Sequence, residues 1–446
     1  MVWSPSHPAP ASAFDAADGA TRPAGLTTLP PPAAGECPPT SLEQLLRQRR
    51  VLMLQGPIGW FFARLAALLR AHGQDVVKVH FNGGDDWFWR GPGAVRFAEP
   101  VANWPQALRS LLARQRTDAV VLFGQSRLMH EIAIREARAL GIAVYVFEEG
   151  YVRPDYVTLE VGGVNGHSSI PRDRGFYDTL QTDDPPLPLP THQSFGGVAD
   201  LAMTYALATT LGAWAYPHYQ HHRSLHPIAE GLRWVRGYSR KWAYRWRDRD
   251  TLAELCGDDR RKRWFLAPLQ VWNDSQIRMF SPYRDVGQFI ERVMQSFAEH
   301  ADAGDWLVFK HHPLDRPYSD YTTLIARRAL ALGISARVRY VHDLHLPTLL
   351  KQARGVVTVN STTGLQALYH GTPVVTLGDC LYAVDGLVHR GPLEAFWREP
   401  RTVDLPLFHR FRAHLVRETQ LNASFYAETP GLASITEASR RLATAS

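Results

Sequence analysis

The chain is poor in cysteine and contains no long hydrophobic run. Its 446 residues include three cysteines, Cys37, Cys256 and Cys380, with neither paired spacing nor a neighbouring metal-ligand pattern. This scarcity argues against a disulfide framework and a structural zinc, and it favours a reducing cytosol. No stretch of about 18 apolar residues indicates a bilayer-spanning helix, and the N-terminus lacks the basic and apolar regions of a secretory signal. We therefore expect a cytoplasmic protein that is at most peripheral on a membrane.

The sequence also lacks the common cofactor and nucleotide motifs. Its glycines do not show GxGxxG spacing, so a nicotinamide or flavin cofactor is unsupported. No GxxxxGK[ST] segment is present, which argues against a P-loop kinase or ATPase. No recognisable nucleic-acid module is present either, so we expect no nucleic-acid partner.

What the sequence does contain is a globular composition with a modest excess of positive charge. Hydrophobic residues make up 45% of the chain and charged residues 21%, and the formal net charge is +6. A chain of this length exceeds one ordinary core, so two domains are expected. The positive charge favours anionic partners such as nucleotides and phospholipid head groups.

Strand-like and helix-like segments alternate twice along the chain. The first set of expected strands is Val51–Leu54, Val76–Phe81, Ala119–Phe123 and Ala143–Phe147, with helices such as Gln106–Arg116 and Leu128–Leu140 between them. The second set is Trp264–Pro268, Trp306–Phe309, Val338–Val341, Gly355–Val359 and Val374–Leu377, alternating with helices Val286–Ala301, Tyr321–Leu332, Leu346–Gln352 and Thr363–Tyr369. Such alternation predicts mostly parallel, doubly wound sheets.

The predicted fold class is α/β and GT-B-like: two Rossmann-like domains whose parallel sheets face a central cleft, with helical middle and C-terminal segments. The expected divisions are a disordered Pro/Ala-rich tail (1–45), an N-terminal acceptor domain (46–195), a basic aromatic helical insertion (196–258), a C-terminal nucleotide-donor domain (259–400) and a C-terminal helical segment (401–446).

The middle segment combines aliphatic stretches with a run rich in histidine, arginine and tryptophan, from His218 to Trp246. One interpretation is a helical linker with a solvated basic face. The other is a surface that docks on anionic lipid, because basic and Trp residues on one amphipathic element suit a membrane interface. Both interpretations are compatible with the sequence.

Two short polar segments stand at strand ends. Glu148-Glu149-Gly150 follows one apolar run, and Lys310-His311-His312-Pro313 follows another. Chemistry in α/β proteins is concentrated at the carboxyl ends of strands. Adjacent side chains on an extended chain point in opposite directions, so one carboxylate can face the cleft while the other braces backbone or Arg153.

These residue types are suited to group transfer. A carboxylate in a partly dry cleft can act as a base or as a nucleophile. His312 belongs to the residue type that titrates near neutral pH and could donate to a departing phosphate, Lys310 adds positive charge, and Pro313 restricts the loop. The alternatives are a surface ion pair for the acidic segment and a loop histidine satisfied by backbone.

A third segment, Asn360-Ser361-Thr362-Thr363-Gly364, lies between a strand and a helix. Hydroxyls and free backbone N–H groups at a helix start can bind an anion. Simple N-capping by Ser361 or Thr362 is the alternative, and the two roles are compatible because the first turn has several free donors.

Two glycine-containing loops follow the first two strands, on the same sheet edge as Glu149: Gln55-Gly56-Pro57 and Asn82-Gly83-Gly84-Asp85-Asp86. Their glycines permit close backbone approach to a ligand. No DxD motif follows a strand in the expected place, so we expect no metal, although Asp85-Asp86 keeps that option open.

The ordered set of motifs carries a family resemblance. They are LQGPIGWFFARLA (54–66), FNGGDDWFW (81–89), VFEEGYVRPDYVTLE (146–160), PLQVWNDSQI (268–277), FKHHP (309–313) and VNSTTGLQALYHGTPVVTLG (359–378). Spanning roughly residues 50–395, the set resembles the capsule polysaccharide biosynthesis family, in particular its KpsS/LipB-type β-Kdo transferases. Each motif alone is weak, but their order is specific.

This resemblance implies a retaining GT-B glycosyltransferase that transfers β-Kdo from CMP-Kdo to a phosphatidylglycerol-type lipid without a cofactor. It implies the cytoplasmic face of a Gram-negative inner membrane as the location, with other capsule enzymes and the export complex as partners. Many relatives carry Asp where this chain has Glu149, so this side chain reaches one methylene further. Its role as base or as covalent nucleophile is therefore undecided.

The resemblance also implies residue roles. Glu149 becomes the catalytic carboxylate beside Glu148, and His312 contacts the donor phosphate. The donor side is completed by Lys310, His311, Pro313, Gln270, Asn360, Ser361, Thr362, Thr363 and Gly364. The acceptor side or cleft comprises Gln55, Gly56, Pro57, Asn82, Gly83, Asp85, Asp86 and Arg153.

Two other functions are compatible with these residues. One is a related transferase with a different CMP- or CDP-linked donor, such as a sialyl or glycerophosphate transferase, since HP and Ser/Thr loops occur there too. The other is a non-catalytic component of capsule assembly or export, in which substitution of Glu149 or His312 would leave capsule formation intact.

Overall fold

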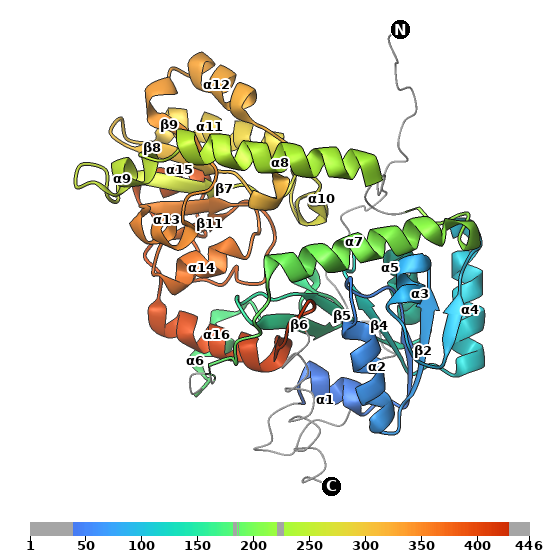
Figure 1. Cartoon of the computed structure of the whole chain (residues 1–446). Coiled ribbons are helices and arrows are strands. Elements are labelled where there is room, and N and C mark those ends of the chain that lie inside the picture. Colours follow the sequence, from blue (N-terminus) through green and yellow to red (C-terminus); the bar gives the residue numbers. More distant parts are fainter. Residues whose placement is uncertain (1–38, 182–184, 186, 221–226, 428–446) are drawn as a thin grey trace. The chain divides into compact units, whose positions relative to one another are not determined.

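The computed structural model describes residues 39–181, 185, 187–220 and 227–427 (Figure 1). Most of the predicted tail lies outside these residues. Its last part belongs to helix α1 (Ser41–Leu46), where Thr40 and Glu43 form a capping box. Leu42 and Leu45 of this helix are buried. The prediction of disorder is therefore wrong for residues 39–45, because a capped helical turn places two leucines in the core there.

The first sheet has seven strands in the order β12-β6-β5-β4-β1-β2-β3. Strands β3, β2, β1, β4 and β5 are parallel, whereas β6 and β12 are antiparallel to their neighbours. The sequence patterns did not predict β3, β6 or β12. The bounds are β1 (Arg50–Met53), β2 (Asp75–His80), β3 (Ala94–Arg96), β4 (Ala119–Phe123), β5 (Ala143–Glu149), β6 (Tyr156–Val161) and β12 (Gln420–Asn422).

The second sheet is wholly parallel, in the order β11-β10-β7-β8-β9. Its strands are apolar runs with nearly all residues buried, as expected where helices cover both faces of a parallel sheet. The predicted strands of this half agree with the structure to within one residue at each end. The bounds are β7 (Trp264–Pro268), β8 (Trp306–Lys310), β9 (Val338–Val341), β10 (Gly355–Thr358) and β11 (Val374–Thr376).

Helices connect the parallel strands in both halves, as the alternation predicted (Figure 1). The predicted fold class of two Rossmann-like domains in a GT-B-like chain is confirmed. In the first domain the helices are α2 (Phe61–Ala71), α3 (Gly83–Trp87), α4 (Trp104–Gln115), α5 (Leu128–Ala139) and α6 (Arg174–Asp178). In the second they are α10 (Ser275–Phe280), α11 (Val286–His300), α12 (Thr322–Ala331), α13 (Leu346–Gln352), α14 (Thr363–Tyr369) and α15 (Leu393–Arg398).

The middle segment forms α7 (Phe195–Leu211), α8 (Pro227–Arg247) and α9 (Thr251–Cys256), so its predicted helical character is confirmed. Helix α7 packs closely on α3, which replaces the loop predicted at residues 82–86. A Cβ atom on Gly83 would lie 2.2 Å from the carbonyl oxygen of Ala208. A Cβ atom on Gly84 would lie 2.5 Å from the ring of Tyr205. These glycines therefore allow two helices to touch.

The C-terminal segment is only partly helical. Helix α16 (Leu405–Thr419) confirms the helical prediction, but strand β12 follows it directly and pairs with β6. The chain thus returns from the second domain to complete the first sheet. A strand of three residues has too little periodicity to be recognised in a sequence. Residues 428–446 of the predicted segment lie outside the described part.

Replacement of Gly83 by alanine tests the contact between α3 and α7. The added methyl group would overlap the Ala208 carbonyl, so we expect the free energy of unfolding to fall by about 1–3 kcal/mol. Urea unfolding followed by tryptophan fluorescence measures the change. A Cβ atom on Gly196 of α7 would meet nothing within 4 Å, and Gly196→Ala is the matched control. Equal stability of the two variants would contradict the packing described.

Candidate active site at the strand ends

Both sheets have the same switch point in their strand order. The first strand of each domain lies beside the fourth, as β1 beside β4 and β7 beside β10. The loops that follow such a pair diverge to opposite faces of the sheet and leave a crevice that binds ligands in doubly wound proteins. In this chain each switch point is bridged by a side-chain hydrogen bond, between Gln55 and Arg127 in one domain and between Gln270 and Asn360 in the other.

Arg127 is the residue at the first switch point that the sequence analysis missed. It follows β4, and its Nη1 donates to Gln55 Oε1 at 2.8 Å and to the Gly56 carbonyl at 3.4 Å. The available signal was a basic residue placed just after the strand Ala119–Phe123. The guanidinium group also lies close enough to Glu148 to lower the pKa of that carboxyl group.

At the second switch point the side-chain amide groups of Gln270 and Asn360 are hydrogen-bonded to each other. Gln270 Nε2 donates to Asn360 Oδ1 at 3.1 Å and to Asp274 Oδ2 at 2.9 Å. Asn360 Nδ2 donates to the Gln276 carbonyl at 3.0 Å. The structure therefore brings together two predicted donor-side residues and adds Asp274, which caps helix α10.

The two adjacent carboxylates lie inside strand β5, which runs two residues further than predicted. Glu148 pairs with Thr158 and Glu149 with Val157 of the antiparallel strand β6. Glu149 Oε1 accepts a hydrogen bond of 2.9 Å from the Tyr426 hydroxyl. Tyr426 was missed because it lies 277 residues further along the chain. Glu149 is thus held by a tyrosine that the sequence patterns did not indicate.

Glu148 has a different environment. Its Oε1 accepts a hydrogen bond from the Glu149 backbone N–H at 3.1 Å. Burial raises the pKa of Glu148 to about 7, and the negative charges of Glu149 and Asp274 act in the same direction. Asp274 belongs to the second domain, so the charge of one domain acts on the carboxyl group of the other. At neutral pH, Glu148 is poised between its neutral and charged forms.

Lys310, the last residue of β8, and the two histidines that follow it lie in different surroundings. Lys310 Nζ donates to the His342 carbonyl at 3.0 Å, and burial lowers the pKa of this amine to about 8. His311 is 2% exposed, and its Nδ1 lies 2.6 Å from the Tyr340 hydroxyl. Burial lowers the pKa of His311 to about 3. His311 therefore contacts the protein interior, while its assignment to the donor site stays a prediction.

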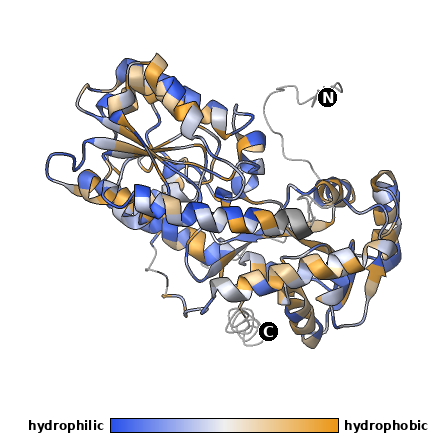
Figure 2. Cartoon of the chain, turned by 45° about the horizontal axis from the view of Figure 1, so that its top comes forward, coloured by the Kyte–Doolittle hydropathy of each residue, from blue (hydrophilic) through white to orange (hydrophobic). Residues whose placement is uncertain are grey.

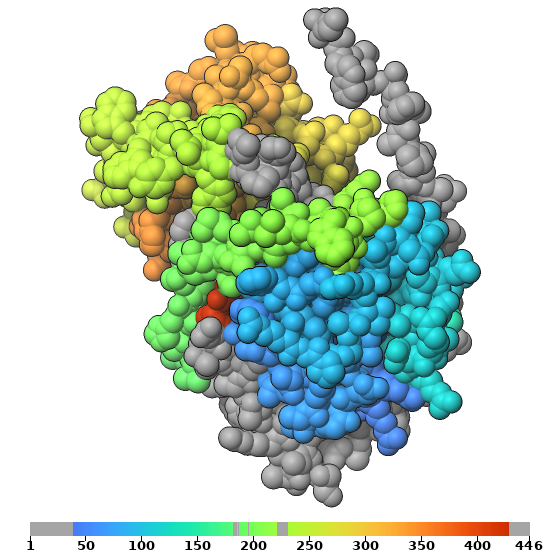
Figure 3. All heavy atoms as spheres, turned by 45° about the vertical axis from the view of Figure 1, so that its right-hand side comes forward, coloured from blue at the N-terminus to red at the C-terminus, as the bar shows by residue number. Residues whose placement is uncertain are grey.

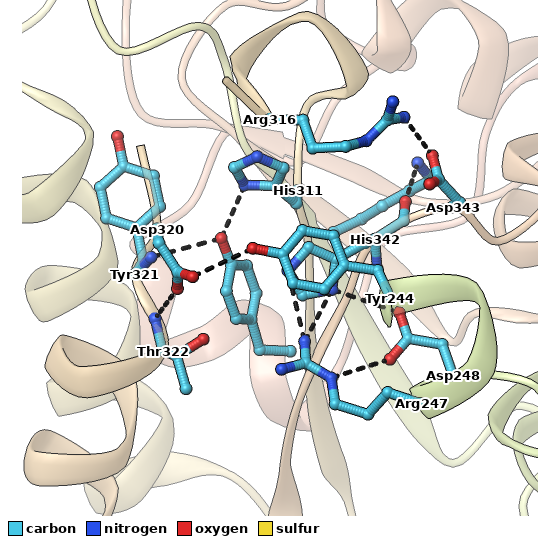
Figure 4. Close-up of polar contacts among 12 residues, drawn as sticks. Tyr244, Arg247, Asp248, His311, Arg316, Asp320, Tyr321, Thr322, His342 and Asp343 are labelled. Atoms are coloured by element: carbon cyan, nitrogen blue, oxygen red, sulfur yellow. Dashed lines mark hydrogen bonds and ion pairs between the residues drawn. The ribbon is translucent and has the colours of Figure 1, made fainter. Parts of the chain in front are cut away.

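Behind His311 a polar cluster joins α8 to β9 (Figure 4). The ring of Tyr244 stacks on His342 with the centroids 3.6 Å apart. Asp248 Oδ2 accepts from the His342 backbone N–H at 2.7 Å and lies 3.2 Å from His342 Nδ1. Tyr244 also donates to Asp320 Oδ2 at 3.0 Å. The cluster holds His342, the residue after β9, whose carbonyl group accepts the hydrogen bond from the Lys310 amine.

His312 is half-buried and turned differently from His311. Its Nδ1 accepts a hydrogen bond of 3.2 Å from the Leu314 N–H, which caps the 3₁₀ turn Pro313–Asp315. Burial lowers the pKa of His312 to about 4, with the charges of Lys310 and Arg153 acting in the same direction. The imidazole is therefore neutral at pH 7. Because Nδ1 accepts, its proton resides on Nε2, which leaves that atom as a hydrogen-bond donor.

The segment before α14 is held by its own hydroxyl groups and by Tyr382. Ser361 Oγ accepts from the Thr363 N–H at 3.2 Å and donates to Thr363 Oγ1 at 3.1 Å. The Tyr382 hydroxyl donates to the Ser361 carbonyl at 2.6 Å, and a Cβ atom on Gly364 would lie 2.3 Å from that hydroxyl. Thr362 makes no side-chain capping bond and lines a small pocket together with Asn360.

Contacts between residues of the two domains bring these strand ends together. Ser126 Oγ and Ser275 Oγ are 2.8 Å apart, and each follows a strand of a different domain. Arg172 forms an ion pair with Asp379. Arg153, after β5, lies close enough to His312 to lower its pKa. These contacts join segments that neighbour the acidic and the histidine-bearing ones, and the charge of Arg153 acts on His312. The meeting of the acidic and the histidine-bearing segments themselves stays a prediction.

The predicted acceptor residues after β1 and β2 make contacts within the first domain and the middle helices. Asn82 caps α3 and donates to the Tyr205 hydroxyl at 2.7 Å, while Asp86 lies 2.6 Å from His80 Nδ1. Asp85 lies 3.8 Å from the buried Lys78 amine. Pro57 is buried, and a Cβ atom on Gly56 would lie 2.7 Å from the Phe62 ring. Their role in acceptor binding stays a prediction.

Among the described residues, no group of three or more His, Cys, Asp or Glu side chains is arranged to hold a metal ion. In the same part of the chain, no helix is both long and apolar enough to cross a membrane.

Replacement of Glu148 by glutamine is expected to stabilise the protein in a pH-dependent way. The raised pKa means that the folded state binds a proton more tightly than the unfolded state, so stability falls as pH rises from about 4.5 to about 7. At pH 8 the variant should gain on the order of 2 kcal/mol relative to the native chain, and at pH 4.5 almost nothing. Urea unfolding at both pH values measures this, with the exposed Glu399→Gln as control. An equal effect at both pH values would contradict the desolvated carboxyl group.

Known proteins share this arrangement of segments. The family described as "Capsule polysaccharide biosynthesis protein" matches residues 118–426. The capsule polysaccharide export protein KpsS of Escherichia coli is 40% identical over 390 residues, covering 86% of this chain and 99% of that protein. The capsule polysaccharide modification protein LipB of Neisseria meningitidis serogroup A is 37% identical over 396 residues, covering 87% of this chain and 94% of that protein.

Solved structures are more distant. The β Kdo 2,7 transferase KpsC of Thermosulfurimonas dismutans is 15% identical with a TM-score of 0.40, covering 88% of this chain and all of that one. Anabaena HepE in complex with UDP and glucose is 10% identical with a TM-score of 0.33, covering 89% of this chain and 100% of that one. The match of the family over most of the chain, together with relatives aligned nearly end to end, identifies this chain as a member of the capsule polysaccharide biosynthesis family.

Proposed function

We propose that the protein is a retaining glycosyltransferase that moves β-Kdo from CMP-Kdo to a phosphatidylglycerol-type lipid and so begins a capsule linker. Membership of the capsule polysaccharide biosynthesis family supports the pathway. The observation that carries the proposal is the pair Glu148 and Glu149, two adjacent carboxyl groups in different surroundings at the end of β5. Two such groups can divide the roles of nucleophile and proton acceptor.

On the donor side, neutral hydrogen-bond donors are available for the phosphate of CMP. His312 presents Nε2–H, and the hydroxyl of Thr362 is not used as a helix cap. Lys310 adds an amine whose pKa of about 8 leaves it mostly charged at pH 7. Hydrogen bonds and positive charge aimed at a departing phosphate stabilise the transition state in which CMP leaves. No metal or cofactor is required for this step.

On the sugar side, we propose that the Glu149 carboxylate attacks the anomeric carbon of Kdo. The bond between that carbon and the phosphate oxygen breaks, CMP leaves with the electron pair, and a glycosyl ester forms on Glu149. An acceptor hydroxyl then attacks the same carbon and releases Glu149, while its proton passes to ionised Glu148. Two displacements preserve the β configuration, and the Tyr426 hydrogen bond orients the attacking carboxylate.

Loss of Glu149 or of the donor-side imidazole should slow turnover strongly. His312→Ala is expected to lower kcat for CMP release by about 10²–10⁴-fold, the usual contribution of a positioned proton donor, and Glu149→Gln by at least as much. The assay follows CMP release from CMP-Kdo with phosphatidylglycerol as acceptor. His345, which is exposed and contacts Thr348, supplies the control variant His345→Ala.

The same assay with CMP-sialic acid and CDP-glycerol separates this function from a related transferase. Turnover with one of these donors and none with CMP-Kdo would assign the site to that donor. Full capsule formation in cells that carry Glu149→Gln would show that the protein is a non-catalytic assembly component.

The pH dependence of turnover should follow Glu148. If its ionised form accepts the proton of the acceptor hydroxyl, kcat rises with pH through about 7, the pKa given to this group by burial, and falls above about 8 as the Lys310 amine loses its charge. In Glu148→Gln the rise should disappear and the maximal rate should be lost. A rate that falls as pH rises through 7 would instead make Glu148 a proton donor.

A further inference from the structure

Helix α8 has an outward face that the fold does not use. The aromatic and aliphatic residues Val235, Tyr238, Trp242 and Trp246 recur at helical spacing and form one stripe. They are 69%, 64%, 59% and 71% exposed. Large apolar side chains in such a contiguous exposed row mark an interaction surface.

Basic side chains border this stripe. Arg236, Lys241, Arg245 and Arg249 are all exposed. Arg249 lies over the Trp246 ring at 5.5 Å and also forms an ion pair of 3.0 Å with the exposed Asp250. Residues 231–247 contain no acidic residue. We call the four stripe residues and these four basic residues the α8 docking face. Its charge is complementary to an anionic surface.

The opposite face of α8 holds the helix on the second domain. Gly237 lies against Pro317, since a Cβ atom there would be 2.8 Å from the proline ring. Arg240 donates to the carbonyl groups of Arg316 and Ser319 at 2.9 and 3.3 Å. Tyr244 is buried on His342. The helix is therefore fixed through one face, and the docking face cannot turn inward without breaking these contacts.

Helix α7 carries a second exposed apolar row. Met203, Leu207 and Leu211 lie four residues apart, and Trp214 follows; they are 61%, 60%, 68% and 84% exposed. Figure 2 shows α7 as one of the most hydrophobic helices at the surface, and both α7 and α8 are visible on the face drawn in Figure 3.

We propose that the α8 docking face binds an anionic phospholipid bilayer. Tryptophan and tyrosine favour the level of the head groups, and arginine and lysine are attracted to anionic lipids. We take a bilayer rather than a soluble acidic protein as the occupant because tryptophan and tyrosine bordered by basic side chains match the polarity gradient of the head-group region. The proposal goes beyond the catalytic function because it concerns residues outside the strand-end site and needs no donor sugar.

Flotation of the full chain with lipid vesicles tests the proposal. We expect binding to vesicles of phosphatidylcholine with phosphatidylglycerol, little binding to phosphatidylcholine alone, and weakening as salt rises. Arg236→Gln/Lys241→Gln/Arg245→Gln should lower the partition coefficient roughly 100-fold, since each basic side chain contributes about five-fold near an anionic surface. Trp242→Ser/Trp246→Ser should also lower it at least ten-fold, by loss of buried ring area.

Matched controls come from exposed residues elsewhere. Trp87 on α3 is 55% exposed and Arg327 on α12 is exposed, so Trp87→Ser and Arg327→Gln should bind vesicles like the native chain. Thermal unfolding of every variant checks that it is folded. Failure of the native chain to bind, or equal binding by the docking-face variants, would overturn the proposal. So would binding to single-stranded RNA in place of vesicles.

Turnover on two forms of acceptor separates this proposal from the proposed function. With phosphatidylglycerol dispersed in detergent, docking-face variants should release CMP at the native rate, because no bilayer has to be bound. With vesicles the same variants should be at least ten-fold slower. A native chain that binds vesicles but releases no CMP would leave the docking face intact and remove the proposed reaction.

Discussion

Removal of titratable groups from water at the strand ends is the constraint on which the chemistry of this protein depends. Burial raises the pKa of Glu148 and lowers the pKa of Lys310 and His312. The shifts are opposite in sign but have one cause, because burial disfavours the charged form of an acid and of a base alike. The pKa values of Glu148 and Lys310 are thereby moved toward 7 from opposite sides, so that both groups can exchange protons near neutral pH. The pKa of His312 is moved to about 4, so this side chain is a neutral hydrogen-bond donor at pH 7.

The middle helices are part of this constraint. Tyr205 of α7 accepts hydrogen bonds from Gln55 and Asn82, the polar residues that follow β1 and β2. Tyr244 of α8 stacks on His342, whose carbonyl group accepts a hydrogen bond from the Lys310 amine. Each helix therefore covers polar groups at the strand ends of one domain with a tyrosine and leaves another face to solvent. This explains how a segment that has the composition of a linker is required for the geometry of both domains.

Several elements of the site could be read from the chain because they are local. The apolar runs that become β7, β9, α13 and α14 have the bounds that their patterns predicted. The polar segments at residues 148–150 and 310–313 follow such runs, so their position at strand ends also followed. Arg127 was within reach of the same argument, whereas Asp274 and Tyr426 were not. Tyr426 is brought to Glu149 by β12, a strand of three residues that pairs across 262 to 266 positions of sequence.

The sequence by itself determined the alternation of strands and helices, the residue types at the strand ends and the membership of a capsule polysaccharide biosynthesis family, because each depends on neighbouring or ordered residues. The tertiary structure decided how identical residues that are adjacent in the chain differ in their surroundings. His311 and His312 are adjacent in the chain, yet one contacts Tyr340 in the interior and the other keeps a donor atom outside its capping bond. Glu148 and Glu149 likewise differ in burial and in their neighbours, which are Arg127 and Asp274 for Glu148 and Tyr426 for Glu149. Burial and long-range contacts set these differences, and neither is encoded in the spacing of residues along the chain.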